Sequence, residues 1–230
     1  MNILEVKNVK KAFGKAQIID DVSFEIKPNR IVGLLGKNGC GKTTILKMIN
    51  DLYTIDEGEI LVCGNTVGVE SKKVISFLPE RTYLDSELKI YEALDYFKTF
   101  YSDFDKEKAL KLLNDLNLNP NMRLSKMSKG MKEKVQLALV MSRNAKLYIL
   151  DEPLGGVDPT TRDYILKTIL SNFNDGASLL ITTHIISDVE SILDDVIFLD
   201  NGKIILHGDA DKLRQSENAS INEIFRRVIK

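Results

Sequence analysis

The segment Ile-Val-Gly-Leu-Leu-Gly-Lys-Asn-Gly-Cys-Gly-Lys-Thr, residues 31–43, joins a short apolar run to a glycine-rich loop. The run from Ile31 to Leu35 is typical of a strand that is buried on both faces. Residues 36–43 match the pattern G-x-x-x-x-G-K-[ST], and apolar residues follow them with helical spacing. A strand, a glycine loop and a helix in this order predict an α/β fold with a loop that binds phosphate.

The loop contains the residue types that hold a phosphate group. Its glycines let the backbone curl so that successive amide N–H groups converge on phosphate oxygens. Lys42 adds a positive charge at the β- and γ-phosphates, and the Thr43 hydroxyl can hold Mg²⁺. The helix that follows directs its positive end at the same anion. Cys40 is interpreted as a small filler of the loop rather than as a redox switch.

The segments on either side of the loop alternate between strand and helix patterns. Apolar and polar residues alternate from Val22 to Ile26, which indicates a half-buried strand, and Glu59 to Val62 resembles another. Two further apolar runs, Leu147 to Leu150 and Leu179 to Thr182, are separated by a predicted helix from Asp163 to Phe173. Because strands alternate with helices, the sheet is expected to be mostly parallel.

Between about Leu84 and Met141 the hydrophobic period changes from two residues to 3.6. Two helical stripes are expected there, and they consist of Tyr91, Leu94, Phe97 and Tyr101, and of Leu110, Leu113 and Leu116. This block is predicted to be a helical insertion into the sheet. The expected division of the chain is a core of residues 1–83 and 142–210, a helical subdomain of residues 84–141, and a C-terminal helix of residues 220–230 with a capping box of Ser220 and Glu223.

Two carboxylates follow the apolar run that ends at Leu150. Asp151 stands at the carboxyl end of a buried strand beside the phosphate loop, where it is placed to hold Mg²⁺ directly or through water. Glu152 can reach past the metal to an attacking water as a general base. An acidic pair after a strand is weak evidence by itself, but it becomes strong together with the phosphate loop. His184 follows the other apolar run, and taken alone such a histidine is more often a structural hydrogen-bonding group.

The composition excludes several classes of protein. The 230 residues include 43% hydrophobic residues, which is enough for a sizeable core, and 32 basic against 33 acidic residues give a net charge of −1. Proteins that coat nucleic acids are usually strongly basic, so no nucleic-acid partner is expected. The longest stretch without Asp, Glu, Lys or Arg is the 12 residues from Gly176 to Ser187, whereas a membrane span needs roughly 20. With an early charged segment and two cysteines, the chain is expected to be soluble and intracellular.

A further segment, Leu124-Ser-Lys-Met-Ser-Lys-Gly-Met-Lys132, lies shortly before Asp151 and opens an apolar helix. It resembles the L-S-G-G-Q signature of the ATP-binding-cassette (ABC) ATPases, with Ser128 at the helix N-terminus. The resemblance covers nearly the whole chain. It implies a P-loop NTPase core with a mixed, mostly parallel sheet, an antiparallel β subdomain and an inserted α-helical subdomain. Ser128 taken alone is an ordinary N-cap residue.

The resemblance also implies roles for individual residues. ATP would be bound by Phe13, which stacks on adenine, and by the loop residues Gly36, Lys37, Asn38, Gly39, Cys40, Gly41, Lys42, Thr43 and Thr44. The ATP of the opposite protomer would contact Ser128, Gly130 and Asp158. Mg²⁺ would be held by Thr43, Glu80 and Asp151. Glu152 would be the catalytic base, and His184 would sense the γ-phosphate.

Three departures from the family pattern affect the contact with the ATP of the opposite protomer and the coupling of ATP hydrolysis to transport. The glutamine of the family's glutamine loop is Glu80 here, which keeps an oxygen for the metal but adds a charge. The first signature glycine is Lys129 and the signature glutamine is Met131. Residues 155–158 are Gly-Gly-Val-Asp where Ser-Ala-Leu-Asp is usual. The hydrolytic residues are unaffected, so ATP hydrolysis is expected.

The resemblance finally implies a partner and a location. Two chains, identical or paralogous, would sandwich two ATP–Mg²⁺ molecules and drive integral membrane permease subunits from the inner face of the cell membrane. The motif variants resemble those of export-type systems of bacteria. Two alternatives remain: an ABC-type ATPase acting in translation or DNA repair, and a different phosphate-loop enzyme such as a kinase or a GTPase. A GTPase should carry an N-K-x-D motif, which this chain lacks.

Overall fold

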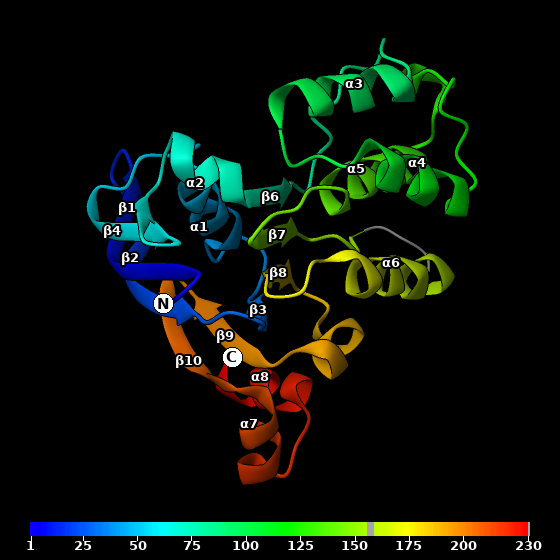
Figure 1. Cartoon of the computed structure of the whole chain (residues 1–230). Helices are drawn as coiled ribbons and strands as arrows, with labels where there is room; N and C mark the ends of the chain where they lie inside the picture. Colours follow the sequence, from blue (N-terminus) through cyan, green and yellow to red (C-terminus); the bar gives the residue numbers. More distant parts are fainter. Residues whose placement is uncertain (156–158, 230) are drawn as a thin grey trace.

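The computed structural model describes residues 1–155 and 159–229, and the side chains of all of these except 159 and 160. Two sheets and several helices surround the phosphate loop (Figure 1). The larger sheet, in spatial order, consists of β10 (Lys203–Asp209), β9 (Asp195–Asp200), β3 (Ile31–Leu35), β8 (Ser178–Thr183), β7 (Leu147–Asp151) and β6 (Ile75–Leu78). Five of these six strands are parallel, and only β10 runs antiparallel to its neighbour β9. The prediction of a mixed, mostly parallel sheet is therefore confirmed.

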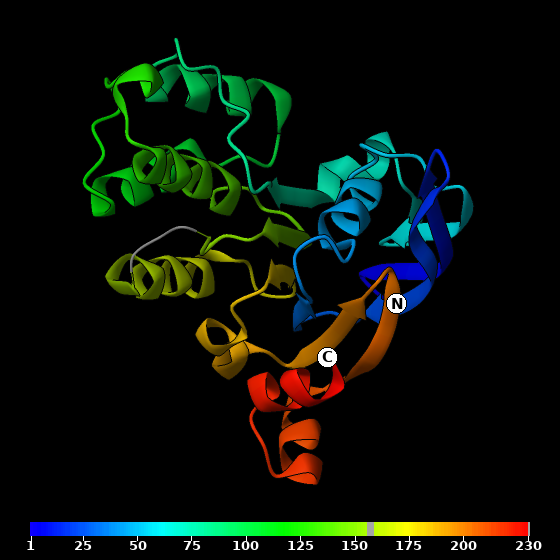
Figure 2. The ribbon, with the colours of Figure 1, turned by 180° about the vertical axis from the view of Figure 1, so that it is seen from behind.

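The smaller sheet is antiparallel and has the order β2-β1-β4-β5. Its strands are β1 (Leu4–Phe13), β2 (Ala16–Ile26), β4 (Glu57–Val62) and β5 (Asn65–Thr66). The alternation predicted for residues 22–26 holds, since Val22, Phe24 and Ile26 are buried while Ser23 and Glu25 face solvent. The resemblance implied an antiparallel β unit of this kind, and it lies beside the N-terminus in Figures 1 and 2.

Helices cover both faces of the larger sheet. Alternating residues of each buried strand separate two hydrophobic clusters: in β7, Ile149 joins the cluster with α1 (Lys42–Ile49) and the antiparallel sheet, whereas Tyr148 and Leu150 join a second cluster with six other helices. The helices of the second cluster are α3 (Ile90–Phe100), α4 (Lys106–Asp115), α5 (Lys129–Met141), α6 (Pro159–Asn172), α7 (Ala210–Glu217) and α8 (Ile221–Val228). The remaining helix is α2 (Val69–Val74), and short 3-10 turns lie at Leu124–Lys126, Ile186–Asp188 and Glu190–Ile192.

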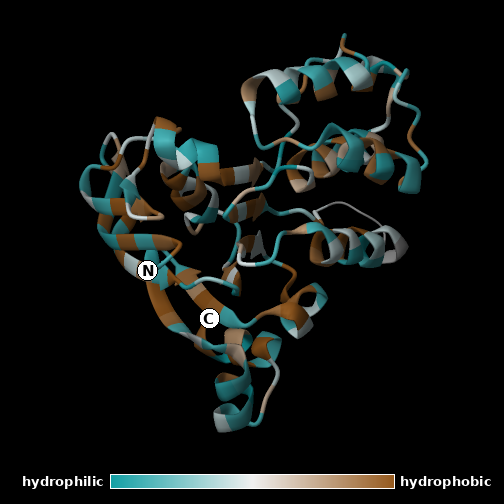
Figure 3. Cartoon of the chain, in the orientation of Figure 1, coloured by the Kyte–Doolittle hydropathy of each residue, from teal (hydrophilic) through white to brown (hydrophobic). Residues whose placement is uncertain are grey.

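Most of the predicted helices are present. The one expected from Asp163 begins four residues earlier, as α6, and the C-terminal helix is α8, with the Ser220–Glu223 capping box in place. The stripe assigned to α4 is wrong at one position, because Leu110 is 38% exposed and Leu112 is buried in its place. Hydrophobic residues gather along β9, while the exposed helix α7 is mostly hydrophilic (Figure 3). No helix of the described residues is long and apolar enough to cross a membrane.

Candidate functional site

The phosphate loop connects the central strand β3 to helix α1, as the sequence predicts. Lys42, the first residue of α1, folds back over the loop, and its ammonium donates to the carbonyl oxygens of Gly36 at 2.8 Å and Lys37 at 3.2 Å. The helix has no side-chain cap, so its first amide groups remain available to an anion. A buried lysine that is anchored to the loop backbone, next to an uncapped helix end, forms a cationic cradle.

Two loop glycines are required by close packing. A Cβ atom at Gly36 would lie 2.4 Å from the carbonyl oxygen of Leu199, at the end of β9. Gly41 has a φ of 112°, and a Cβ atom there would lie 2.5 Å from the Ile19 side chain. Both positions therefore exclude larger residues, because the loop is pressed against β9 and β2. Cys40 is buried in the same packing, and burial raises the pKa of its thiol, which agrees with a filler role.

The loop borders a cavity of about 480 Å³. Its lining includes nine residues that the sequence nominated: Asn38, Gly39, Gly41, Lys42, Thr43, Thr44, Glu80, Glu152 and His184. It also includes three that were not nominated: Ile18, Lys129 and Gly155. Segments that are far apart in the sequence thus meet at the carboxyl edge of the parallel sheet, where open α/β folds bind their ligands.

Asp151, at the end of β7, is 1% exposed and is held by the neighbouring strand β8. One of its oxygens, Oδ1, accepts a hydrogen bond of 2.6 Å from the hydroxyl of Thr182. The hydroxyls of Thr182 and Thr43 both favour the charged form of this carboxylate. Burial, together with the charges of Glu80 and Glu152, nevertheless raises the pKa of Asp151. The carboxylate therefore carries a negative charge that its protein neighbours do not fully compensate.

Glu152 lies between a cation and the predicted sensor histidine. Its Oε1 is 3.4 Å from the Lys42 ammonium, and its Oε2 is 2.9 Å from Nδ1 of His184. The backbone N–H of His184 also faces Oε2, at 3.3 Å. The Glu152 backbone has a φ of 48°, which is uncommon for a residue with a side chain. This conformation, with the Glu152 N–H donating to the carbonyl and the hydroxyl of Thr182, fixes where the side chain starts.

The residues nominated for Mg²⁺ fit that ion. Thr43, Glu80 and Asp151 offer a hydroxyl and two carboxylates, the hard oxygen ligands that Mg²⁺ prefers. Oδ2 of Asp151 is buried without a hydrogen-bond partner among the described residues, so a cation here would relieve uncompensated charge. No group of three or more His, Cys, Asp or Glu side chains in the described part of the chain forms an all-protein metal cage. Mg²⁺ usually takes one or two carboxylates and completes its coordination with substrate phosphates and waters, so the set is sufficient.

Several nominated residues lie outside the lining of this cavity. The Phe13 ring, 45% exposed, makes an edge contact with Tyr53 at 5.3 Å and lies 5.4 Å from the Lys11 ammonium. Ser128 caps α5 by accepting from the Met131 N–H, and Gly130 is exposed in the first turn. Their contacts with adenine and with a second nucleotide stay predictions. Asp158 and the neighbouring positions 156 and 157 lie outside the described residues.

The comparison with known proteins agrees with this geometry. The sequence profile of the ABC transporter family matches residues 19–155, which include the phosphate loop, the Ser128 segment and both carboxylates. The chain belongs to the ABC transporter family. The resemblance deduced from the signature segment is thereby confirmed.

Relatives in this family align with almost the whole chain. The linearmycin resistance ATP-binding protein LnrL of Bacillus subtilis is 31% identical over 97% of this chain and 77% of its own length. The lipopolysaccharide export system ATP-binding protein LptB of Haemophilus influenzae is 31% identical over 94% of this chain and 95% of its own. The solved structure of an ATP-binding subunit of an ABC transporter superposes with a TM-score of 0.91 at 29% identity, covering 99% of this chain and 100% of that one. This chain therefore aligns with nearly the full length of LptB and of that subunit.

Two site residues were missed for different reasons. Thr182 holds the Asp151 carboxylate and the backbone N–H of Glu152, yet in the sequence it is only the polar end of an apolar run. Two threonines immediately before His184 are the signal that could have found it. Lys129 was noticed as a departure from the signature, but its place beside the phosphate loop depends on how α5 packs, which the local sequence does not specify.

Proposed function

We propose that this chain binds and hydrolyses ATP and thereby powers transport by separate membrane-spanning subunits. The observation that carries the proposal is the convergence of Lys42, Asp151 and the Glu152–His184 pair around the phosphate loop. The loop and the lysine provide a site for the phosphates. The carboxylates provide the metal ligand and the base. The family, whose relatives are named as ATP-binding proteins, supports the same nucleotide.

In the proposed reaction, a water attacks the γ-phosphate. Glu152 accepts the proton of that water as its O–P bond forms, while the bond to the leaving β-phosphate oxygen breaks. His184 holds Oε2 of this base, and the Lys42 ammonium stabilises charge on the phosphates. Mg²⁺, held by Thr43, Asp151 and Glu80, would neutralise charge between the β- and γ-phosphates. The products are ADP and phosphate.

We propose that two such chains act together. Ser128 and Gly130 are exposed at the N-terminal end of α5, an end that favours an anion. In the proposed dimer this end, with Asp158, faces the ATP of the other protomer. The dimer is a homodimer or a pair of paralogues.

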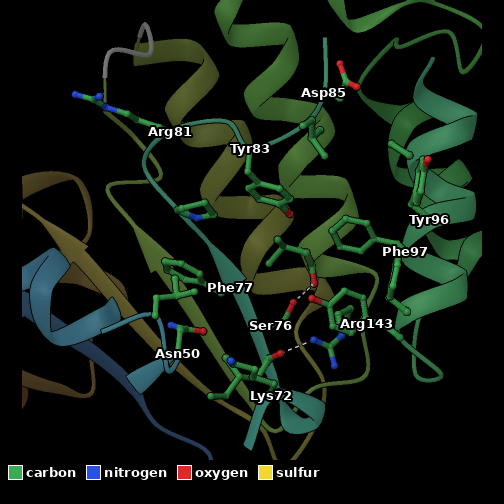
Figure 4. Close-up of a pocket in the computed structure, with 18 of the residues that line it drawn as sticks. Asn50, Lys72, Ser76, Phe77, Arg81, Tyr83, Asp85, Tyr96, Phe97 and Arg143 are labelled. Carbon is green, nitrogen blue, oxygen red and sulfur yellow. Dashed lines mark hydrogen bonds between the residues drawn. The ribbon is translucent and has the colours of Figure 1, made fainter. Parts of the chain in front are cut away.

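A groove beside the helical block offers a docking surface for the membrane subunit. It has a volume of about 740 Å³ and lies between β6 and helix α3. In Figure 4, Tyr83 lies between Phe77 on one side and Phe97 of α3 on the other, and Arg143 lies below Phe97 in this view. Tyr96 and Phe100 of α3, whose rings stack on each other, are 54% and 75% exposed at its rim and form an exposed apolar patch, which is typical of an interaction site. We propose that residues 84–141 form one subdomain and that a segment of a permease subunit packs into this groove.

The proposed direction of transport is export, and the proposed location is the inner face of the cell membrane, attached to the permease. LptB, a relative named as part of a lipopolysaccharide export system, supports the direction, and so do the motif variants of this chain. A role in translation or DNA repair is the alternative. It would use the same ATP chemistry and differ only in the partner.

The chemistry is tested by comparing the wild-type chain with the Glu152→Gln variant. The wild-type chain should hydrolyse ATP with Mg²⁺. The variant should bind ATP with similar affinity, lose most of the hydrolysis, and form dimers with ATP–Mg²⁺ in light scattering. Combining it with Ser128→Glu should abolish the dimer, while the matched change Ser125→Glu, in the preceding exposed turn, should not. An absence of ATP binding in the wild-type chain would refute the proposal.

A further inference from the structure

Behind the carboxylate of Asp151 lies a second, much smaller cavity of about 20 Å³. Four segments enclose it: the end of β6 with the residues after it, helix α5, the residues at the end of β7, and helix α6. Most of its wall is apolar, formed by Leu78, Leu137 and Ile165 among others. Buried residues form its inner part, while Glu80 and Glu133 are more exposed, and Glu80 also lines the cavity that borders the phosphate loop.

Two polar atoms in its lining residues lack a hydrogen-bond partner within the described parts of the chain. Gln136 of α5 is 2% exposed, and its amide nitrogen Nε2 is unpaired. Asp151 is 1% exposed, and its oxygen Oδ2 is unpaired, while Oδ1 is held by Thr182. An unpaired buried donor and an unpaired buried acceptor are each costly, and native proteins almost always satisfy them. Both residues border the same small space.

This space suits one water molecule. A buried water needs roughly 10–15 Å³ and two to four polar partners. The cavity exceeds that volume and offers one amide donor, from Gln136, and carboxylate acceptors from Asp151, Glu80 and Glu133. A water that accepts from Gln136 Nε2 can donate one hydrogen to Asp151 Oδ2 and the other to Glu80 or Glu133. The water would then make three hydrogen bonds, and both unpaired atoms would gain a partner.

We infer that this cavity is a built-in water site through which Gln136 positions Asp151. The inference rests on the proposed function in one respect, namely that Asp151 is a ligand of Mg²⁺. With Oδ1 fixed by Thr182 and Oδ2 fixed by the water, the plane of the carboxylate cannot rotate. Glu80 lines both cavities, so its carboxylate can accept a hydrogen bond from the same water. Gln136 is thus a positioning residue of the metal site, although it lies in a helix away from the nucleotide.

The placement of Gln136 follows from helix geometry. Residues 133, 136 and 137 lie on one face of α5, since positions three and four apart share a face, and this face is turned to the ends of β6 and β7. Gln136 is the buried polar member of an otherwise apolar run from Val135 to Met141. Packing alone would be served equally well by leucine or methionine here, so the amide points to a polar partner.

The first test is a crystal structure of the Glu152→Gln chain with ATP–Mg²⁺. The expected result is a water within about 2.7–3.2 Å of both Gln136 Nε2 and Asp151 Oδ2. An empty cavity, or a Gln136 amide turned to another partner, would overturn the inference. This result does not depend on hydrolysis, and it stands even if a Gln136 variant fails to fold.

The second test measures Mn²⁺ affinity in place of Mg²⁺ by electron paramagnetic resonance, in the ATP complex of the Glu152→Gln chain. Adding Gln136→Met keeps the side-chain volume and removes the donor, so it should weaken Mn²⁺ binding about tenfold, the lower end of the effect of outer-shell changes. Binding of ATP without metal should not change. Leu139→Met, in the same helix and outside the cavity, is the matched control and should leave Mn²⁺ affinity as it is.

Different results refute the proposed function and the positioning role of Gln136. If the Glu152→Gln chain itself binds neither ATP nor Mn²⁺, the proposed function is wrong. If that chain binds both and Gln136→Met binds Mn²⁺ within twofold of it, the positioning role of Gln136 is wrong and the proposed function stands.

Discussion

Replacing Thr182 by valine tests the arrangement of the two carboxylates. Valine has nearly the same shape, so Thr182→Val removes a hydroxyl without leaving a cavity. That hydroxyl donates to Asp151 Oδ1 at 2.6 Å and accepts from the Glu152 N–H at 3.1 Å. The Glu152 N–H keeps its bond to the Thr182 carbonyl, so the loss falls mainly on Asp151. Its Oδ2 is already unpaired within the described residues, and the variant would leave a buried carboxylate with few donors.

The expected cost follows from the charge on the acceptor. Hydrogen bonds to charged groups contribute about 1.5–3 kcal/mol, compared with about 0.5–1.5 kcal/mol for neutral pairs. In a chain of this size each kcal/mol shifts the melting temperature by roughly 2–4 °C, so Thr182→Val should lower it by about 3–12 °C. Urea unfolding at pH 7 in EDTA measures the free energy without metal.

Thr183→Val is the matched control in the same strand. Among the described residues its hydroxyl accepts from the N–H of Ile185, a neutral group, and makes no other hydrogen bond, so this variant should lose less than Thr182→Val. If Thr182→Val unfolds with a free energy within about 0.5 kcal/mol of the wild-type value, or no lower than Thr183→Val, Thr182 does not hold the carboxylate as described.

Three further predictions concern the base, the loop and the response to acid. Glu152→Gln should slow ATP hydrolysis by about 10²–10⁴-fold, the usual contribution of a positioned base, and wild-type turnover in a phosphate-release assay would contradict its assignment. Gly36→Ala should destabilise the chain by about 1–3 kcal/mol in urea unfolding, because its Cβ would meet the Leu199 carbonyl at 2.4 Å, whereas Gly130→Ala, with open space in a helix, should be neutral or stabilising. The Lys212 N–H and the Arg30 guanidinium hold the pKa of Asp209 below its usual 3.8, so the stabilisation by this carboxylate is present above that pH and is lost as the pH falls. Asp209→Asn should therefore lower the melting temperature at pH 7 and differ less from the wild-type chain near pH 2, and an equal difference at both pH values would contradict this linkage.

Local sequence patterns predicted much of the sheet and the centre of the site. A five-residue run without polar side chains is typical of a buried strand, and Ile31–Leu35 is β3 as predicted. The glycine loop is constrained by its own backbone, so its position between β3 and α1 follows from the motif. Asp151 and Glu152 are found because they end a second buried strand, and parallel strands end at the same edge.

Features that depend on packing between distant segments were not predictable in the same way. Leu110 and Leu112 both fit a helical stripe, and only the direction in which α4 meets its neighbours leaves Leu110 exposed. Lys129 has an exposed position in the signature segment, and nothing in the local sequence indicates the loop cavity that it borders. The small cavity next to Asp151 is lined by residues of four segments, so no single stretch of sequence predicts it.

The central claim is that ATP hydrolysis by this chain powers a membrane partner. The most direct measurement is to purify the tagged Glu152→Gln chain with ATP–Mg²⁺ from detergent-solubilised native membranes and to identify the polypeptides that accompany it. We predict an integral membrane protein, which should be lost when the exposed groove residues Tyr96 and Phe100 are both changed to glutamate and kept when Leu110, exposed on α4, is changed to glutamate. Recovery of ribosomal or nucleic-acid-bound proteins, with nothing from the membrane, would contradict the transport function and leave only the ATPase chemistry.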